Sequence, residues 1–433
     1  MTIEQLYGLY TQYPVICTDT RKITEGCLFF ALKGENFDAN QFAGQAIALG
    51  AAYAIIDRAE CQAGERFILA DDVLTTLQQL ARYHRDRLNI PVIGITGTNG
   101  KTTTKELINA VLSQKYTTYA TQGNLNNHIG VPLTLLAVGR DIEIAVIEMG
   151  ANHPGEIEFL CNIARPTHGI ITNVGKAHLE GFGGYEGVKR TKGELYRHLA
   201  QTRGIAFINH DNTELIAMSN LAALQNRIYY GTGTDNVVSG SFDIIDNFLR
   251  VHWKHPDGTL HEAQSNLTGT YNFENVLAAI CIGSFFELPP EQVNRGVAAY
   301  RPTNNRSQIT QTGHNVLVCD YYNANPSSMA VALENLAALK AEHKAVILGD
   351  MFELGAEAAQ EHQAVVQRAA SLDLDKRIFV GKEFYELRHR FAGDFYLTTA
   401  DAYAALKQHP LENYTILLKG SRSMKLEQLV ELL

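Results

Sequence analysis

The chain has 433 residues, a length that exceeds what one ordinary hydrophobic core organises, so we expect two to four domains. Apolar residues make up 45% and charged residues 19% of the sequence, which is typical of a globular protein and excludes a disordered or fibrous one. The net charge of −9, from 37 basic and 46 acidic residues, disfavours a nucleic-acid-binding protein, although a phosphate ligand needs only local basic groups.

Cysteine spacing and apolar runs bear on the compartment. The six cysteines are scattered without a CxxC pair, which favours reduced, mostly buried thiols over a disulfide framework or a zinc site. The first residues, MTIEQLYGLYTQYP, lack the basic start and apolar run of a signal peptide. No apolar run approaches the ~20 residues of a spanning helix. We therefore expect a cytoplasmic protein without membrane insertion, with a monomer as the default.

Short β-branched runs alternate with segments of helical periodicity through most of the chain. Residues 73–88 predict a helix, after which the runs PVIGIT, AVIEMG, GIITNVG, NVLVCDYY, KAVILGD, RIFVG and YTILLKG are each followed by a helix-like stretch, as in 187–199. This alternation predicts an α/β fold made of βαβ units with largely parallel sheets. The polar, alternating stretch 235–268 predicts antiparallel strands, and 298–308 has the composition of a linker.

Residues 94–106, GITGTNGKTTTKE, place a glycine-rich turn between a predicted strand and a predicted helix. Backbone N–H groups and the positive end of the helix would surround an anion there. Lys101 would reach the β- and γ-phosphates of a nucleotide, and the Thr102 hydroxyl would ligate Mg²⁺. Ile95 stands where the common motif has glycine, and a chance Gly-Lys-Thr turn is the alternative. The absence of an Asn-Lys-x-Asp motif favours ATP over GTP.

Three later polar features could complete such a site, and each has a plainer alternative. Glu148 ends an apolar strand in VIEMGAN, where it could help to hold Mg²⁺ in the crevice above the sheet, or could be solvated or cap a helix. His178, in the glycine-rich loop ITNVGKAHLEGFGG, is a candidate ligand or an ordinary surface residue. Lys189 and Lys192 lie three residues apart on a predicted helix, for which a solvated charged face is the plainer interpretation.

Nine motifs occur in the same order as in one known family. They are GTNGKTTT, GNLNNHIGVPLTLL, EMGANHPGEIEFL, ITNVGKAHLEGFGG, KGELY, YNFENVLAA, DYYNANPSSM, LGDMFELG and LLKGSRSMKLE. From about residue 18 to its C-terminus the chain therefore resembles the Mur ligase superfamily. GTNGKTT alone would indicate only the superfamily, which includes the folylpolyglutamate synthases. GNLNNHIGVPLTLL and YNANPSSM resemble the branch that adds D-alanyl-D-alanine.

The resemblance implies three domains and a reaction. Residues 1–86 would bind the UDP substrate, 87–300 would form the central P-loop ATPase with a parallel sheet, and 301–433 would form a C-terminal Rossmann-like domain. The implied activity is ATP-dependent ligation of D-alanyl-D-alanine to the terminal carboxylate of UDP-N-acetylmuramoyl-tripeptide through an acyl phosphate, giving the pentapeptide precursor of peptidoglycan. ATP and two Mg²⁺ ions would be the cofactors. UDP-N-acetylmuramoyl-tripeptide and D-alanyl-D-alanine, the two acceptor substrates, would be the partners.

Carried over position by position, the resemblance assigns overlapping groups of site residues. The catalytic residues would be Lys101, Glu148, His178 and Lys192, with Lys192 carbamoylated. The metal ligands would be Thr102, Glu148, His178 and Lys192, since a carbamate is carboxylate-like. The nucleotide would contact Gly97, Thr98, Asn99, Gly100, Lys101, Thr102, Thr103, Asn272, Asn275, Arg306 and Asp320. The acceptor substrates would contact Thr20, Arg21, Asn126, Asn127, Asn323, Asn325 and Lys419, with Ser421 and Arg422 as further candidates.

Three segments depart from the family pattern. Thr20 stands in place of serine in the uridine-site motif TDTRK and retains the hydroxyl. The turn GENFDANQF, residues 34–42, replaces a more usual Asp-Gly-His. Thr-Asn-Asn-Arg replaces the usual Pro-Gly-Arg that ends at Arg306.

Two rival functions make different predictions. Another ligase of the superfamily would add a single amino acid, but residues 320–329 differ from the motif of the lysine- or diaminopimelate-adding members. A P-loop switch ATPase would turn over slowly without small acceptors, and it offers no reason for the asparagine-rich motifs. Whether the tripeptide ends in lysine or diaminopimelate depends on pocket shape and stays open.

Overall fold

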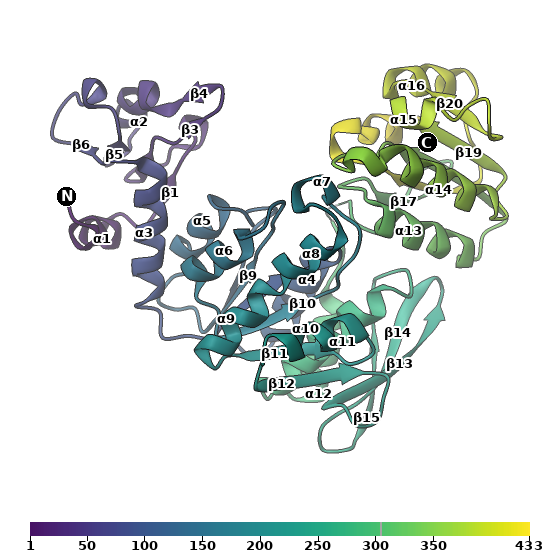
Figure 1. Ribbon diagram of the computed structural model, residues 1–433, viewed down its shortest axis with the longest axis horizontal. Coiled ribbons are helices and arrows are strands. Elements are labelled where there is room, and N and C mark those ends of the chain that lie inside the picture. The colour runs from purple at the N-terminus through teal and green to yellow at the C-terminus, as the bar shows by residue number, and fades with distance from the viewer. Residues whose placement is uncertain (304) are drawn as a thin grey trace.

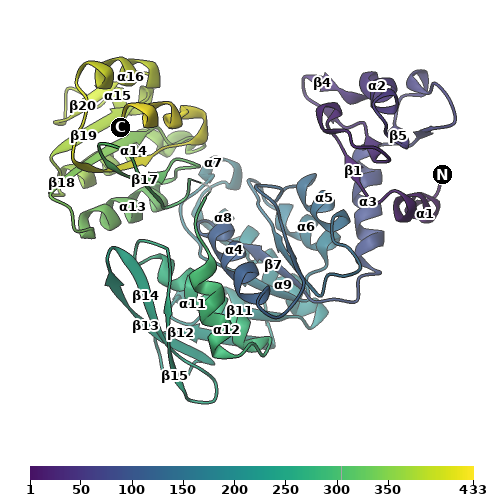
Figure 2. The ribbon, with the colours of Figure 1, turned by 180° about the vertical axis from the view of Figure 1, so that it is seen from behind.

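The computed structural model describes residues 1–303 and 305–433 and shows a mixed α/β protein in three parts. The N-terminal and C-terminal parts stand on opposite sides of a central part (Figure 1), and the view from behind shows the same arrangement (Figure 2). Within the described residues, no helix has both the length and the apolar character needed to cross a membrane. The six cysteines are free, and all but Cys61 are buried.

The N-terminal part is built on a small parallel sheet. Its strands lie in the order β1 (Ile16–Cys17), β2 (Leu28–Phe30), β5 (Tyr53–Ile56) and β6 (Phe67–Leu69), beside a hairpin of β3 (Lys33–Gly34) and β4 (Phe37–Asp38). The helices are α1 (Ile3–Gln12), α2 (Ala43–Ala48) and α3 (Val73–Arg85). Asp72 caps α3 by accepting from the backbone N–H of Thr75 at 2.7 Å. Arg85, at the end of this helix, donates to the carbonyl of Ala164 at 2.9 Å, so α3 joins the N-terminal and central parts.

The central sheet places the predicted phosphate loop in its middle. Its order is β15 (Leu260–Gln264), β14 (Phe248–Lys254), β13 (Val238–Ile245), β12 (Asn226–Gly231), β11 (Ile205–Asn209), β10 (His168–Ile171), β7 (Val92–Thr96), β9 (Ile144–Glu148) and β8 (Thr118–Ala120). Pairing is parallel from β8 to β13 and antiparallel from β13 to β15. β10 and β9 flank β7, so their carboxyl ends meet at the crevice where open α/β sheets bind ligands.

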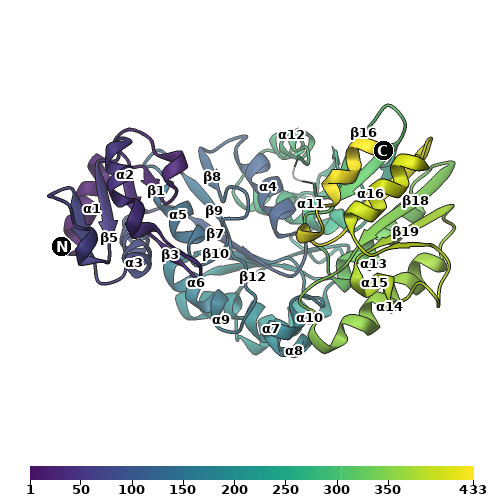
Figure 3. The same cartoon turned by 90° about the horizontal axis from the view of Figure 1, so that it is seen from above.

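Helices cover both faces of the central sheet (Figure 3). One face carries α4 (Lys101–Leu112), α11 (Asn272–Phe285) and α12 (Pro290–Ala299), and the other carries α6 (Glu156–Ala164), α8 (Tyr185–Lys192), α9 (Glu194–Thr202) and α10 (Thr213–Leu221). Leu107 and Val276 are fully buried in the first layer, and Ile157 and Leu195 in the second. Two further helices are α5 (Gly130–Leu136) and α7 (Leu179–Phe182). Both layers hold the sheet rigidly beneath the loops at its carboxyl end.

The C-terminal part is a second parallel sheet with one antiparallel edge strand. Its order is β16 (Gln308–Gln311), β17 (Val316–Asp320), β21 (Tyr414–Lys419), β18 (His343–Gly349), β19 (Lys376–Val380) and β20 (Asp394–Tyr396), with β16 antiparallel to β17. The helices are α13 (Pro326–Ala338), α14 (Ala358–Ala370), α15 (Lys382–Tyr385) and α16 (Thr399–Gln408). Asn325 caps α13 by accepting from the backbone N–H of Ser328 at 2.8 Å.

The predicted α/β architecture is confirmed, with differences in detail. The strands predicted within 235–268 are β13, β14 and β15, in antiparallel pairing. The helix predicted over 73–88 ends at Arg85, and the one predicted over 187–199 is divided at Gly193 into α8 and α9. The division comes where the Glu194 carboxylate accepts from two backbone N–H groups at the start of α6, at 2.9 and 2.8 Å. The predicted linker 298–308 includes residue 304, which lies outside the described residues, and the domain limits stay a prediction.

Candidate active site

The glycine-rich turn between β7 and α4 adopts a backbone that side chains rarely tolerate. Gly97 has a φ of 144° and Gly100 a φ of 78°. A Cβ on Gly97 would lie 2.0 Å from the hydroxyl oxygen of Thr172, and that hydroxyl donates to the carbonyl of Asn99 at 2.6 Å. The neighbouring β10 end therefore holds the turn in one shape, with its N–H groups and the start of α4 available to an anion.

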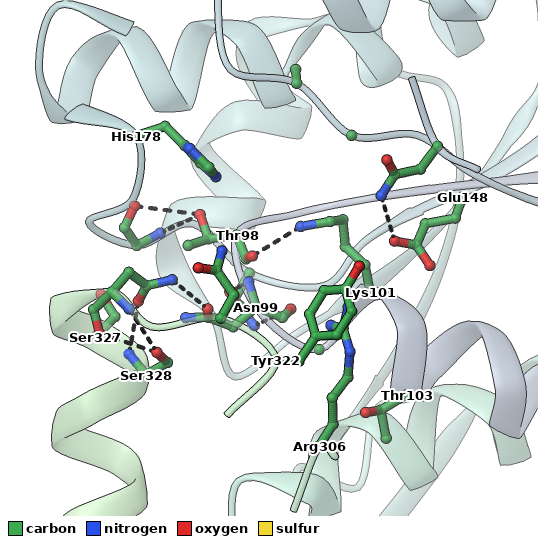
Figure 4. Close-up of a pocket in the computed structure, with 18 of the residues that line it drawn as sticks. Thr98, Asn99, Lys101, Thr103, Glu148, His178, Arg306, Tyr322, Ser327 and Ser328 are labelled. Atoms are coloured by element: carbon green, nitrogen blue, oxygen red, sulfur yellow. Dashed lines mark hydrogen bonds between the residues drawn. The ribbon is translucent and has the colours of Figure 1, made fainter. Parts of the chain in front are cut away.

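Lys101 closes over this turn (Figure 4). Its ammonium donates to the carbonyls of Gly97 and Thr98, at 2.8 and 3.0 Å. Burial lowers the pKa of Lys101 to about 8; the Glu148 carboxylate opposes this shift and the Arg306 charge adds to it. A phosphate would offer the ammonium a stronger acceptor than two neutral carbonyls, so the side chain is placed to receive one.

Glu148, at the end of β9, has one oxygen engaged and one free. Its Oε1 accepts from the Thr102 hydroxyl at 3.3 Å and from the Asn126 amide at 2.9 Å. Its Oε2 is buried and has no hydrogen-bond partner among the described residues. A buried carboxylate oxygen is costly when it is left unpaired, and carboxylate and hydroxyl oxygens are ligands that Mg²⁺ prefers. Glu148 and Thr102 therefore fit one divalent cation.

The other two predicted metal ligands have different neighbours. His178 pairs through Nδ1 with Glu353 of the C-terminal part, and burial lowers the pKa of His178. Lys192 is buried, with Nζ 3.5 Å from the carbonyl of Ala151, and burial followed by the Lys101 charge lowers its pKa to about 7. No three His, Cys, Asp or Glu side chains converge as a metal site in the part of the chain that the structure describes.

Two asparagines brace the phosphate-loop helix from α11. The Asn275 amide donates to Asn272 Oδ1 at 2.9 Å, and Asn272 donates to the carbonyl of Thr268 at 2.7 Å. The hydroxyl of Thr104 in α4 donates to Asn275 Oδ1 at 3.0 Å. The pair predicted near the adenine is therefore held rigidly at the side of the nucleotide loop.

The C-terminal part reaches the phosphate loop through the turn before α13. The Asn325 amide donates to Asn99 Oδ1 at 2.9 Å. Lys419, which is 2% exposed, donates to Asp320 Oδ2 at 2.6 Å and to the carbonyl of Asn323 at 3.3 Å. Residues separated by more than two hundred positions in the sequence thus face each other across one space.

That space is a cavity of about 720 Å³ between the central and C-terminal parts. Most predicted site residues line it: Thr98, Asn99, Gly100, Lys101, Thr103, Asn126, Asn127, Glu148, His178, Asn272, Asn275, Arg306, Asp320, Asn323, Asn325 and Lys419. Gly97, Thr102 and Lys192 are not part of this lining. Thr102 lies directly behind it, in contact with Glu148. Thr20 and Arg21 belong to the N-terminal part, where the Arg21 guanidinium pairs with Asp19 at 2.8 Å.

Sequence reasoning missed an aromatic platform in this cavity. The Arg306 guanidinium lies over the Tyr322 ring, 3.9 Å from its centroid, and Arg422 approaches the same ring at 5.1 Å. Figure 4 shows Arg306 and Tyr322 side by side next to Lys101. The sequence feature that could have indicated this contact is the second tyrosine of DYYNANPSSM. It follows a predicted strand, where side chains face the crevice.

A pair of contacts beside the cavity was missed as well. Lys176, on the loop that carries His178, donates from Nζ to Glu361 of α14 at 2.6 Å, and its backbone N–H donates to the Ser327 hydroxyl at 2.9 Å. Lys176 belongs to the motif ITNVGKAHLEGFGG, but nothing in the sequence around Glu361 indicates that it is the partner of Lys176. Only the packing of the two parts brings these charges together.

Comparison with known proteins shows the family to which the chain belongs. Models of the Mur ligase family match in three consecutive stretches: its catalytic domain over residues 12–85, the Mur ligase middle domain over 95–283 and the glutamate ligase domain over 305–422. UDP-N-acetylmuramoyl-tripeptide–D-alanyl-D-alanine ligase from Bacillus subtilis is 36% identical, with 96% of this chain and 92% of the relative covered.

Solved structures agree with these matches. MurF from Acinetobacter baumannii aligns with a TM-score of 0.86 at 32% identity, over 96% of this chain and 92% of that one. MurF ligase from Thermotoga maritima in complex with ADP aligns with a TM-score of 0.83 at 26% identity, over 96% of both chains. The chain belongs to the Mur ligase family, in the branch whose members are named UDP-N-acetylmuramoyl-tripeptide–D-alanyl-D-alanine ligase.

Proposed function

We propose that this protein is an ATP-dependent ligase that joins D-alanyl-D-alanine to the terminal carboxylate of UDP-N-acetylmuramoyl-tripeptide, giving the pentapeptide precursor of peptidoglycan. The names of its relatives support the two acceptors, and the ADP complex of a related structure supports the nucleotide. The observation that carries the proposal is the shared cavity, lined by the phosphate loop on one side and by Asn323, Asn325 and Lys419 on the other. The reaction would take place in the cytoplasm, with the protein acting as a monomer.

The phosphate loop is the donor half of this site. Backbone N–H groups of residues 97–100, the start of α4 and the ammonium of Lys101 would hold the phosphates of ATP. Thr103, on the first turn of the same helix, would also contact the nucleotide. Asn272 and Asn275 would lie near the adenine, Asp320 near the ribose, and Arg306 with Tyr322 along the nucleotide.

One cation fits the arrangement as it stands, and a second requires rearrangement. Thr102 and Glu148 would hold the first Mg²⁺, because Glu148 Oε2 is buried and free of a partner among the described residues. A divalent cation there would neutralise charge that develops on the transferring phosphoryl group. His178 would have to exchange Glu353 for the second cation. Lys192 would contribute only as a carbamate, whose formation requires its amine to be neutral, and its lowered pKa favours that form.

The acceptor half would use groups from all three parts. Thr20 and Arg21 would hold the uridine end, and Asn126 and Asn127 the muramoyl end of the substrate, while Asn323, Asn325 and Lys419 would face the dipeptide. A tripeptide carboxylate oxygen would attack the γ-phosphorus, break its bond to the β,γ-bridging oxygen and release ADP. The D-alanyl-D-alanine amine would then attack the acyl carbon, and phosphate would leave as the amine loses its proton. Lys101 would balance phosphate charge throughout, and closure of the C-terminal part would exclude water.

Release of ADP by the purified protein tests the proposal. We expect release to require both UDP-N-acetylmuramoyl-tripeptide and D-alanyl-D-alanine, with mass spectrometry showing the pentapeptide product. A panel of single amino acids in place of the dipeptide separates this function from that of another Mur or folylpolyglutamate-type ligase. ADP release that needs neither acceptor would instead indicate a switch-type ATPase and would overturn the proposal. Tripeptides that end in lysine or in diaminopimelate, compared in the same assay, identify the third residue.

A further inference from the structure

Lys105 is a fully buried lysine that the proposed chemistry does not use. It lies on α4, one turn beyond Lys101, and its side chain is 0% exposed. It does not line the cavity, since the described lining from α4 consists of Lys101 and Thr103. A buried ammonium is tolerated only where acceptors compensate for its lost hydration, so its partners indicate what it holds.

Its acceptors are the backbone carbonyl of Thr121 and the carboxylate of Glu106. The ammonium donates to Thr121 O and lies 2.9 Å from Glu106 Oε1. Thr121 comes directly after β8, and its hydroxyl accepts from the backbone N–H of Glu148 at 2.9 Å. Lys105 therefore connects the phosphate-loop helix to the residue that positions the backbone of Glu148.

The segment that begins at Thr121 returns to Glu148 a second time. The Asn126 amide donates to Glu148 Oε1 at 2.9 Å, and the carbonyl of Asn126 accepts from the N–H of Gly150 at 2.8 Å. Asn127 then accepts from the backbone N–H of Gly130 at 2.8 Å, at the start of α5. Thr121 and Asn126 thus both contact Glu148, through its backbone N–H and its carboxylate, and Lys105 ties this segment to α4.

We propose that Lys105 is a positioning residue, which holds segment 121–127 and Glu148 in place relative to the phosphate loop and so couples the acceptor half of the site to the ATP half. The role assigned to Asn126 and Asn127 in holding the acceptor rests on the proposed function. The tie between Lys105 and the segment rests on the contacts alone. Hydrogen exchange and kinetics can therefore test the two separately.

The test compares Lys105→Met with Ile108→Val in the full-length protein. Methionine keeps the length and burial of the side chain without a donor, and Glu106, whose side chain is 35% exposed, can turn to solvent. Ile108 is buried on the same helix, so its truncation reports a general loss of packing. In Lys105→Met we expect the backbone amides of residues 121–128 and of Glu148 to exchange about tenfold faster or more, with the amides of α11 unchanged.

The kinetic readout is a split between substrates. We expect Lys105→Met to raise KM for UDP-N-acetylmuramoyl-tripeptide about tenfold or more, because Asn126 and Asn127, which would hold this substrate, lie on the released segment. KM for ATP at saturating Mg²⁺ should change less than about twofold, because Lys101 and the turn before it keep their contacts. Ile108→Val should show neither the local exchange nor the split. Unchanged exchange in residues 121–128, or the same pattern in both variants, would overturn the proposal. If ADP release by the unmutated protein does not depend on either acceptor, the proposed function is wrong. The exchange result still tests whether Lys105 holds segment 121–127 in place.

Where Lys105→Met does not fold, a second pair of variants tests the other link of the same connection, from Thr121 to Glu148, with the Lys105 contact to the Thr121 carbonyl kept in both. Thr121→Val removes the hydroxyl that accepts from the Glu148 N–H, and Thr121→Ser retains it. We expect faster exchange at Glu148 and a raised acceptor KM in the valine variant only. Equal behaviour of the two Thr121 variants would contradict the proposed connection.

Discussion

At the residue scale, Glu148 combines burial with an unsatisfied oxygen. It is 1% exposed, and its Oε2 has no partner among the described residues. An ion or donor from a ligand would complete it, because a buried carboxylate is otherwise costly. This one side chain therefore connects the structure directly to the proposed chemistry.

Glu148→Gln should reduce kcat/KM by about a hundredfold or more, because the amide keeps the shape but cannot neutralise a cation. The half-saturating Mg²⁺ concentration should rise in parallel. Melting temperature without Mg²⁺ should change little, since the substitution removes a buried charge but also the carboxylate that favours the Lys101 ammonium. Titration of ADP release with Mg²⁺ is the measurement, and Glu60→Gln, on the exposed surface of the N-terminal part, is the control. An unaltered Mg²⁺ dependence in Glu148→Gln would contradict the assignment.

Lys192 makes stability depend on pH. Its pKa is about 7 in the folded protein, because of burial and the Lys101 charge, and about 10.4 in an unfolded chain. Between these values the unfolded state binds more protons, so the free energy of unfolding rises with pH. Below about pH 7 both states are protonated and the full cost of the buried charge remains. Lys192→Met should therefore melt higher than the parent at pH 6 in bicarbonate-free buffer.

The difference in melting temperature should shrink as the pH rises from 7 towards 10, as differential scanning calorimetry can measure. A constant difference over this range would contradict the lowered pKa. In activity, Lys192→Ala should lose turnover, and short carboxylic acids should restore part of it if the carbamate acts as a carboxylate. Mass spectrometry of the active protein, showing an unmodified Lys192, would contradict the carbamate.

At the element scale, the strand–turn–helix unit of β7 and α4 depends on the strand beside it. The turn at Gly97 is shaped by Thr172, which follows β10, and by the hydrogen bond of Asn99 with Asn173 at 3.0 Å. The motif residues are local in sequence, but the space that excludes a side chain at Gly97 is created by another strand.

Gly97→Ala should weaken nucleotide binding strongly, since its Cβ would lie 2.0 Å from the Thr172 hydroxyl oxygen and 3.0 Å from the Thr172 backbone nitrogen. Calorimetric titration with ADP measures the affinity. We expect it to fall about a hundredfold or more, because a displacement of about 1 Å in such a site can have an effect of this size. Gly64→Ala is a matched control: its φ of 147° imposes the same backbone strain, but no described atom lies within 4 Å of the added Cβ. Equal effects of the two substitutions on ADP affinity would contradict the steric argument.

At the scale of the whole molecule, charges from separate parts meet at the cavity rim. Lys176 pairs with Glu361, and His178 with Glu353, in each case across the boundary between the central and C-terminal parts. Gly355 lies against Glu180 at the same place. These contacts hold the C-terminal part over the phosphate loop. Lys176 and Glu361 would take no part in the reaction, whereas His178 would have to exchange Glu353 for a cation.

Lys176→Glu should place two carboxylates together and move the C-terminal part away from the loop. Small-angle scattering should show a larger radius of gyration, and kcat should fall with little change in melting temperature. Lys176→Glu with Glu361→Lys should restore both, with a coupling of about 0.5–1 kcal/mol in a double-mutant cycle because Lys176 is half exposed. A double variant no better than the single one would show that the ion pair does not hold the two parts.

The sequence alone determined the α/β class, the strand–helix rhythm and the phosphate loop, because hydrophobic periodicity and glycine turns are local properties. It also indicated the phosphate loop, Glu148 and His178 as candidate site residues, while the other predicted residues of the cavity lining came from the family resemblance. It did not indicate Tyr322 as a platform for Arg306, the partner of Lys176 or the role of Lys105.

Those three features depend on which elements pack against each other. The Lys176–Glu361 pair spans 185 positions and the Asn99–Asn325 bond 226, so neither leaves a periodic trace in the chain. Whether His178 contacts Glu353 or a cation is likewise decided by how the C-terminal part is placed. Local propensity determined the elements and the donor loop, whereas tertiary packing decided the pairings between parts, because charges and side-chain contacts act through distances that only the folded chain defines.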